Sequence, residues 1–193
     1  MNQPEASFPH DGAVLHWTTR QGTPLLIRHI TAADAPLLVE LYSRLSAETL
    51  WRRFGRVMTG VSPAKVREQA AELSDLDPHT ADALVAILDE GGADRIIAVA
   101  RLAGATDDTA EFALLVRDDF QGQGVGAFIF DLLIQVALVR GLRYLTAYVA
   151  AENAPMLALV RRSGLEYDMD TSHGETDVRI FLTLPFDGPA PAA

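Results

Sequence analysis

The sequence predicts a single α/β domain built on a mixed, mostly antiparallel, twisted sheet that is flanked by helices. Between residues 81 and 117, three apolar, β-rich runs follow one another with short turns between them, as in an antiparallel meander. From residue 124 onward, helical and strand patterns alternate, and glycines stand where the helices should end. A meander followed by helix–strand–helix–strand is typical of one mixed sheet with helices packed on it.

The predicted elements can be justified in chain order by their caps and turns. Gly22 suits the turn of a first hairpin, Thr31 and Ser46 suit helix N-caps, Pro63 suits a first helical position, and Gly141 suits a helix end. The elements are a hairpin over 13–19 and 24–30, helical segments over 32–45, 46–54 and 63–73, strands over 81–89, 94–104 and 109–117, a helix over 124–140, a strand over 143–150, a helix over 153–162, and strands near 165–170 and 176–184.

The organisation is one domain with short additions. Residues 1–24 are predicted to form an N-terminal extension with the start of the hairpin, and residues 25–184 the domain itself. The tail over 185–193 is rich in proline and alanine and is expected to be disordered. The helix over 124–140 carries two apolar stripes; the first consists of Val125, Phe128, Ile129, Leu132, Leu133 and Val136, and the second of Phe130, Ile134 and Leu138. One stripe should pack on the sheet. The other must be covered by the N-terminal hairpin or by a partner chain, and the hairpin is favoured. The oligomeric state is left open between a monomer and a homodimer.

Composition excludes several functional classes. The chain has 193 residues and no cysteine, which rules out disulfides, thiolate catalysis and cysteine-bound zinc. The five histidines have no ligand spacing, so no metal site is expected. A net charge of −10 disfavours nucleic-acid binding. The longest apolar segment, 125–139, is shorter than the roughly 20 residues of a membrane span, and no secretory signal is present. A soluble, cytoplasmic protein is expected.

Three glycines lie within five positions where a predicted strand becomes a helix: Gly122, Gly124 and Gly126. A dinucleotide-binding fingerprint needs a different spacing, and a P-loop needs a Lys-Ser/Thr pair after its last glycine. A tight turn with close strand–helix packing would by itself justify one or two glycines. The remaining interpretation is a helix N-terminus whose free N–H groups face an anion such as a diphosphate.

The segment Gln121–Gly126 resembles the Q/R-x-x-G-x-G/A signature of the GNAT N-acetyltransferase superfamily, whose loop binds the pyrophosphate of acetyl-CoA. The segment from 151 to 165 is similar to that family's asparagine-containing helix, and the resemblance spans about 25–184. Within the superfamily, residues 43–54 resemble a segment of the bacterial protein lysine acetyltransferases called Pat. The resemblance therefore implies a GNAT fold and acetyl-CoA as cosubstrate, without a metal.

Glu111, in the strand before the glycines, is the candidate general base, and the resemblance supports this choice. Its apolar neighbours are expected to desolvate it partly and so to raise its pKa. At the position of the family's proton-donating tyrosine this chain has Val160, so water, Tyr148 or Tyr42 would have to supply that proton. The residues expected to bind the cofactor are Leu114, Val116, Gln121, Gly122, Gln123, Gly124, Val125, Gly126, Ala127 and Asn153.

The leading functional prediction is transfer of an acetyl group from acetyl-CoA to a lysine amine of a protein, with an acyl-CoA synthetase as the candidate acceptor. Acetylation of a small amine such as a polyamine, an amino acid or an antibiotic is the alternative. A non-catalytic acyl-CoA-binding sensor is a third hypothesis, because the usual tyrosine is missing. Acceptor specificity depends on variable loops, so the sequence leaves the acceptor open.

Overall fold

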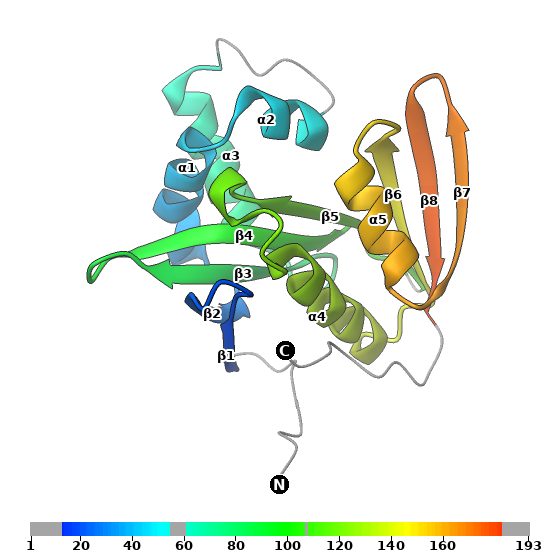
Figure 1. The fold of residues 1–193 in the computed structure, drawn as a ribbon, viewed down its shortest axis with the longest axis horizontal. Helices are drawn as coiled ribbons and strands as arrows, with labels where there is room; N and C mark the ends of the chain where they lie inside the picture. Colours follow the sequence, from blue (N-terminus) through cyan, green and yellow to red (C-terminus); the bar gives the residue numbers. More distant parts are fainter. Residues whose placement is uncertain (1–12, 55–60, 107, 183–193) are drawn as a thin grey trace, which may run out of the picture.

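The computed structural model describes residues 13–54, 61–106 and 108–182 (Figure 1). Eight strands form one sheet in the order β1-β2-β3-β4-β5-β6-β8-β7, and only β5 and β6 run parallel. The mixed, mostly antiparallel sheet of the prediction is therefore confirmed. The strands are β1 Val14–Thr18, β2 Pro24–His29, β3 Asp82–Asp89, β4 Asp94–Ala103, β5 Thr109–Val116, β6 Tyr144–Ala150, β7 Glu166–Ser172 and β8 Glu175–Phe181.

The helices cover both faces of the sheet. Helices α4 and α5 lie on one face, while α1, α2 and α3 lie on the other (Figure 1). The short 3-10 turn η1 precedes α1, and the 3-10 turn η2 precedes the glycine-rich loop, residues 121–124. The bounds are η1 Ala32–Asp34, α1 Ala35–Ser43, α2 Ala47–Phe54, α3 Pro63–Ser74, η2 Asp118–Phe120, α4 Val125–Val139 and α5 Ala154–Arg162. None of these helices is long and apolar enough to cross a membrane, within the part of the chain that the structure describes.

Two predicted helix starts are confirmed by capping hydrogen bonds. Ser46 Oγ accepts the N–H of Thr49 at 3.1 Å, and Ser62 Oγ accepts the N–H of Lys65 at 3.2 Å. Such bonds satisfy N–H groups that have no partner inside the helix, which is why Ser is favoured at these positions. After Thr31 the chain first forms the 3-10 turn η1, in which the Asp34 carboxylate accepts the Thr31 N–H, and α1 begins only at Ala35.

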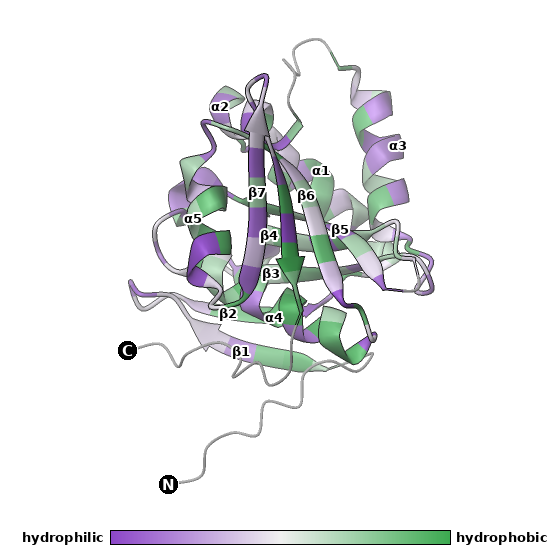
Figure 2. Cartoon of the chain, turned by 90° about the vertical axis from the view of Figure 1, so that its right-hand side faces the viewer, coloured by the Kyte–Doolittle hydropathy of each residue, from purple (hydrophilic) through white to green (hydrophobic). Residues whose placement is uncertain are grey.

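The central strands bury both of their faces because helices pack on each side. In β3, Leu84 and Ala86 belong to the core under α4, while Val85 and Ile87 face α1. Strand β7, by contrast, is almost entirely exposed and polar and forms one edge of the sheet (Figure 2). A polar edge strand discourages pairing with another chain.

The N-terminal hairpin belongs to the sheet, because β2 pairs with β3 over Leu26–His29. Its Trp17 ring stacks on Phe128 of α4, with ring centroids 4.5 Å apart. The second apolar stripe of α4 is covered differently from the expectation: Phe130 is buried and packs against Phe112 of β5 at 5.2 Å. The sheet buries that stripe, and the hairpin covers Phe128 of the first stripe instead.

Strands β5 and β6 pair only at their beginnings, over Thr109–Glu111 and Tyr144–Thr146. Beyond these residues β5 continues beside β4, while β6 continues beside β8 (Figure 1). Beyond Glu111 the sheet is therefore split into two halves, one ending in β5 and the other beginning with β6. The pocket described next lies at this division.

Candidate active site

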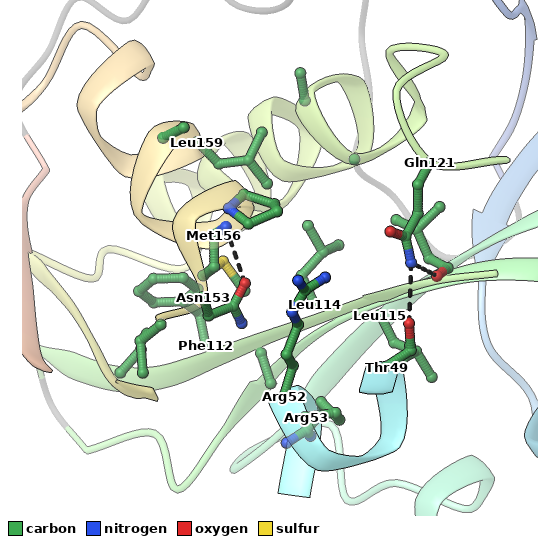
Figure 3. A pocket seen from close by; sticks show the side chains of 18 of the residues that line it. Thr49, Arg52, Arg53, Phe112, Leu114, Leu115, Gln121, Asn153, Met156 and Leu159 are labelled. Atoms are coloured by element: carbon green, nitrogen blue, oxygen red, sulfur yellow. Dashed lines mark hydrogen bonds between the residues drawn. The ribbon is translucent and has the colours of Figure 1, made fainter. Parts of the chain in front are cut away.

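A pocket of about 450 Å³ opens where β5 and β6 separate. Its walls come from the end of β5, the glycine-rich loop, the first turn of α4, one side of α5 and the middle of β6. Helix α2 adds Thr49, Arg52 and Arg53 to the lining (Figure 3). Arg20, in the turn of the N-terminal hairpin, completes it. The pocket therefore collects residues from most of the chain.

Most of the residues predicted for the site line this pocket. The structure brings together Glu111, Leu114, Val116, Gln121, Gly122, Gly124, Gly126, Ala127 and Asn153. Gln123 and Val125 do not line it; both are buried and are used elsewhere. The Gln123 amide donates to the carbonyl oxygen of Asp119 at 2.7 Å and so holds the loop, and Val125 packs in the core.

The end of β5 presents main-chain groups to the pocket. The N–H of Arg117 donates to Ile97 O on β4, and the register pairs Val116 with Ala98 and Leu114 with Ala100. Hydrogen-bonded and non-bonded pairs alternate along an antiparallel ladder. The N–H and C=O groups of Leu114 and Val116 therefore point away from β4, toward the space that β6 has left.

The glycine-rich loop ends in the open N-terminus of α4. Gly124 is the N-cap residue and has φ of 91°, a left-handed conformation that side chains other than glycine rarely adopt. The Phe128 N–H donates to Gly124 O, so the N–H groups before Phe128 have no partner within the helix. A Cβ on Gly126 would lie 3.5–3.7 Å from side-chain atoms of Val116, Leu114 and Leu159, which is ordinary van der Waals contact, so a methyl group would fit here and a larger side chain would have to enter the pocket.

Gln121 connects the loop to α2. Its amide nitrogen donates to Thr49 Oγ1 at 3.2 Å and to Val116 O at 3.1 Å (Figure 3). Asp118 accepts from the Ser46 N–H at 2.9 Å, the Ser46 hydroxyl at 2.6 Å and the Thr49 hydroxyl at 2.7 Å. Burial alone would raise the pKa of Asp118, but the hydrogen bonds from Ser46 and Thr49 outweigh it and lower that pKa. The start of α2 is thereby bound to the segment that carries the cofactor loop.

Glu111 lines the pocket but is exposed, so the expectation that its neighbours desolvate it is wrong. Side chains alternate across a strand, and the flanking Ala110 and Phe112 point into the core beneath α4. Glu111 consequently projects from the opposite face, the one that carries α2. Its carboxylate has access to solvent at the point where β5 and β6 separate.

Helix α2 brings arginines to the same face. Arg52 pairs with Glu48 one turn earlier, at 2.5 Å. Arg53 lines the pocket; burial lowers its pKa, and the negative charge of Glu111 opposes that effect. Arg101 on β4 has its pKa lowered to about 10 by burial and by Arg53. The two cations are partly withdrawn from water and lie near one another.

The hydroxyl groups of the pocket come from Thr49 and Tyr148. Tyr148 on β6 is 72% exposed, whereas Tyr42 packs near Phe54 and does not line the pocket. Val160 is fully buried. Of the two tyrosines considered from the sequence, only Tyr148 is at the pocket.

Asn153 both caps a helix and lines the pocket, where it was expected to bind the cofactor. Its side-chain oxygen accepts the Met156 N–H at 3.3 Å, which makes it the N-cap of α5, and the residue also lines the pocket. Met156 and Leu159 contribute apolar surface from the same helix (Figure 3).

Sequence reasoning missed Arg20 and Asp118. Arg20 lies in the hairpin turn, about a hundred positions before the loop it touches, and nothing local indicates that contact. Asp118 could have been suspected, because its acidic side chain follows β5 directly and α2 begins with two residues able to donate to it. Among the described residues, no group of three or more His, Cys, Asp or Glu side chains is arranged to hold a metal ion.

Comparison with known proteins identifies the family of this chain. A family model of the acetyltransferase (GNAT) domain matches residues 24–166. The chain belongs to the GNAT acetyltransferases. This family membership confirms the resemblance inferred from the glycine spacing.

Two relatives and one solved structure make the comparison more specific. Acetyltransferase Pat of Mycolicibacterium smegmatis is 31% identical over 173 residues, which are 87% of this chain and 50% of that protein. An acetyltransferase of Pseudomonas aeruginosa is also 31% identical, over 73% of this chain and 75% of the relative. The crystal structure of the GNAT domain of S. lividans PAT has a TM-score of 0.74 and 28% identity, covering 88% of this chain and 97% of that one. This GNAT chain spans about half the length of the Pat relative.

Proposed function

We propose that this GNAT chain transfers the acetyl group of acetyl-CoA to a lysine amine of a protein, with Glu111 as the general base. One observation carries the proposal: an exposed glutamate lines the pocket where β5 and β6 separate, on the same strand whose later main-chain groups point away from β4 into that space. The similarity to Pat supports a protein acceptor.

The residues of the pocket fit acetyl-CoA. The diphosphate would bind at the N-terminus of α4, where unpaired N–H groups and the helix dipole favour an anion. The pantetheine arm would lie along the main-chain groups of Leu114 and the N–H of Val116, which point away from β4, against the apolar side chains of Met156 and Leu159. The Val116 carbonyl oxygen already accepts a hydrogen bond from Gln121. Bound acetyl-CoA supplies the activated thioester, and the division of the sheet directs that end toward Glu111.

Glu111 has a defined task in this scheme. A lysine amine has a pKa of about 10.4, so at pH 7 only about one molecule in a few thousand is neutral. An exposed carboxylate can accept the amine proton directly or through one water molecule. The face of the sheet that carries Glu111 also carries the exposed carboxylates Asp168, Asp170 and Asp177 on β7 and β8, with Arg179 of β8 among them.

The departing thiolate needs a proton source, which Tyr148 can supply. It is the tyrosine that lines the pocket within the described residues, and it lies on the strand facing β5. A thiol with a pKa of about 8.5 is also a good leaving group without help. Tyr148 is therefore expected to matter less than Glu111, and Tyr148→Phe should lower kcat only modestly.

An alternative acceptor is a small amine that carries a carboxylate, such as an amino acid. The observation that favours it is Arg53, a half-buried guanidinium in the pocket that forms no ion pair or hydrogen bond among the described residues. Arginine binds carboxylates through two parallel hydrogen bonds. A third possibility is a sensor that binds acyl-CoA without transferring the acetyl group.

Labelled acetyl-CoA, incubated with the purified protein and a cell lysate, tests the lysine proposal. Discrete labelled protein bands that disappear with Glu111→Gln are expected, and trypsin mapping should locate the label on lysine. If label accumulates only in small molecules, the acceptor is a small amine. If neither proteins nor a panel of amines produce acceptor-dependent release of coenzyme A, the sensor hypothesis replaces both.

A further inference from the structure

The turn of the N-terminal hairpin is held against the glycine-rich loop. The Arg20 N–H donates to the carbonyl oxygen of Gln123 at 3.0 Å, and Trp17 stacks on Phe128 of α4. The turn itself is braced by Thr19, whose hydroxyl oxygen accepts main-chain N–H groups of the turn at 3.1 and 3.3 Å. The position of Arg20 relative to the loop is therefore well determined.

The side chain of Arg20 runs over Gly124 into the mouth of the pocket. Its Nε, Cγ and Cδ atoms lie 3.3–3.6 Å from the position a Cβ would occupy on Gly124. Arg20 lines the pocket together with Gly122 and Gly124 and is exposed. Among the described residues its guanidinium has no hydrogen bond or ion pair, so it is available to a ligand.

Among the described residues, the other arginines that line the pocket lie away from the start of α4. Arg52 pairs with Glu48, and Arg53 lies on the α2 side near Glu111. Arg162 is at the end of α5, where its charge acts on Asp131. Arg20 is the cation beside the start of α4.

We propose that Arg20 binds the diphosphate of acetyl-CoA, so that the N-terminal hairpin forms part of the cofactor site. The inference rests on the proposed function, because it assumes that acetyl-CoA occupies this pocket. The loop contains no lysine or arginine of its own from Gln121 to Ala127, and a guanidinium supplies both charge and paired donors to phosphate. Arg20 thus adds to the main-chain groups a contribution that the loop sequence lacks.

The surrounding charges make such a cation useful. The protein carries a net charge of −10, and Asp118 and Asp119 directly precede the loop. Asp119 is paired with Arg117 at 2.7 Å, and Asp118 is engaged by hydroxyl groups. An anionic ligand with several phosphate charges nevertheless approaches a negative surface, and Arg20 opposes that repulsion at the point of binding.

Titration calorimetry on the full chain tests this assignment with Arg20→Gln, Arg20→Lys and, as a matched control, Arg67→Gln. Arg67 is exposed on α3 and does not line the pocket. Arg20→Gln should weaken coenzyme A binding by roughly 10- to 100-fold, the usual range for a hydrogen bond to a charged group. Arg20→Lys should retain part of the affinity, and Arg67→Gln all of it. For Arg20→Gln, the KM for acetyl-CoA should rise, while kcat, reached at saturating acetyl-CoA, stays near that of the wild type.

Dephospho-coenzyme A, which lacks the 3′-phosphate, separates the diphosphate from the other phosphate of the cofactor. The proposal expects the same loss for Arg20→Gln with both ligands. A loss seen with coenzyme A alone would move Arg20 to the 3′-phosphate and overturn the diphosphate assignment. Equal affinity of Arg20→Gln and wild type would remove Arg20 from the site while leaving the proposed function intact. A wild-type protein that binds neither ligand would end both proposals.

Discussion

Glu111 illustrates how one residue's position on a strand determines its chemistry. The alternation of β5 buries Ala110 and Phe112 beneath α4 and leaves Glu111 exposed on the side of α2. An exposed carboxylate is available to an incoming acceptor without any rearrangement of the core. The same alternation explains why apolar neighbours along the chain do not shield it from water.

Glu111→Gln keeps the size of the side chain but removes its basicity. We expect kcat to fall by about 10²–10⁴-fold, the usual contribution of a general base, while acetyl-CoA affinity is unchanged. Raising the pH should partly restore activity, because the neutral fraction of the amine grows. Steady-state kinetics with Glu152→Gln and Glu175→Gln as controls checks this. Near-normal turnover of Glu111→Gln, with loss in a control, would show that another carboxylate is the base.

Asp131 on α4 provides a pH-dependent prediction. Burial raises its pKa to about 6, and the nearby Arg162 opposes this increase. Between about pH 4 and 6 the folded protein retains a proton that the unfolded chain releases, so the contribution of Asp131 to stability falls as pH rises through that window. Asp131→Asn should therefore melt at higher temperature than wild type at pH 7.5, and the gain should vanish near pH 4.

Melting curves between pH 4 and 7.5 measure this difference, with Asp168→Asn on the exposed strand β7 as the control. An Asp131→Asn variant whose gain in melting temperature is the same at both pH values would disprove the effect of burial. A loss at pH 7.5 would instead mean that the carboxylate makes a contact that stabilises its charged form.

At the scale of elements, the start of α4 is where a strand, a loop and two helices converge. A Cβ on Gly126 would be in van der Waals contact, at 3.5–3.7 Å, with Val116, Leu114 and Leu159, all of which line the pocket. A methyl group fits at that distance, whereas a branched side chain has to extend into the pocket or displace its walls. A side chain larger than a methyl group at this position would therefore compete with the cofactor for space in the pocket.

The pair Gly126→Ala and Gly126→Val separates these two effects. Alanine should leave acetyl-CoA affinity within a few-fold of wild type and raise helix stability by about 0.5–1 kcal/mol. Valine should weaken binding by one to two orders of magnitude, about 1.4–2.8 kcal/mol. Calorimetry and thermal melts on both variants provide the comparison. An unchanged dissociation constant for a folded Gly126→Val protein would contradict the placement of the cofactor.

In the whole molecule, the N-terminal hairpin extends the sheet and covers Phe128 of α4. Trp17→Ala should cost about 3 kcal/mol, the lower end of the range for large aromatic residues, because Trp17 is only partly buried. Val14→Ala on the same strand, where Val14 is 49% exposed, should cost under about 0.5 kcal/mol. Urea unfolding measures both changes. Deletion of residues 1–24 should produce an aggregating protein, and a soluble, active truncation would count against this role.

The division of the sheet is also a property of the whole molecule. It brings Glu111, the main-chain groups of β5 that point away from β4, and the N-terminus of α4 to one pocket. Helix α2, bound through Asp118 and Gln121, closes the same pocket from the other face. The site therefore depends on the relative placement of two half-sheets rather than on one contiguous segment.

The amino-acid sequence by itself determined the elements and the family. Caps such as Ser46 and Ser62, the helix end at Gly141 and the glycine spacing act over a few residues, so they can be read without a fold. The tertiary structure decided the exposure of Glu111, the burial of Gln123 and the presence of Arg20 at the pocket. These properties depend on neighbours many positions away, because Arg20 touches Gly124 only after β2 pairs with β3 and Trp17 packs on α4. Helix caps and turns depend on a few neighbouring residues, whereas solvent exposure and contacts between distant residues are determined only when the chain folds.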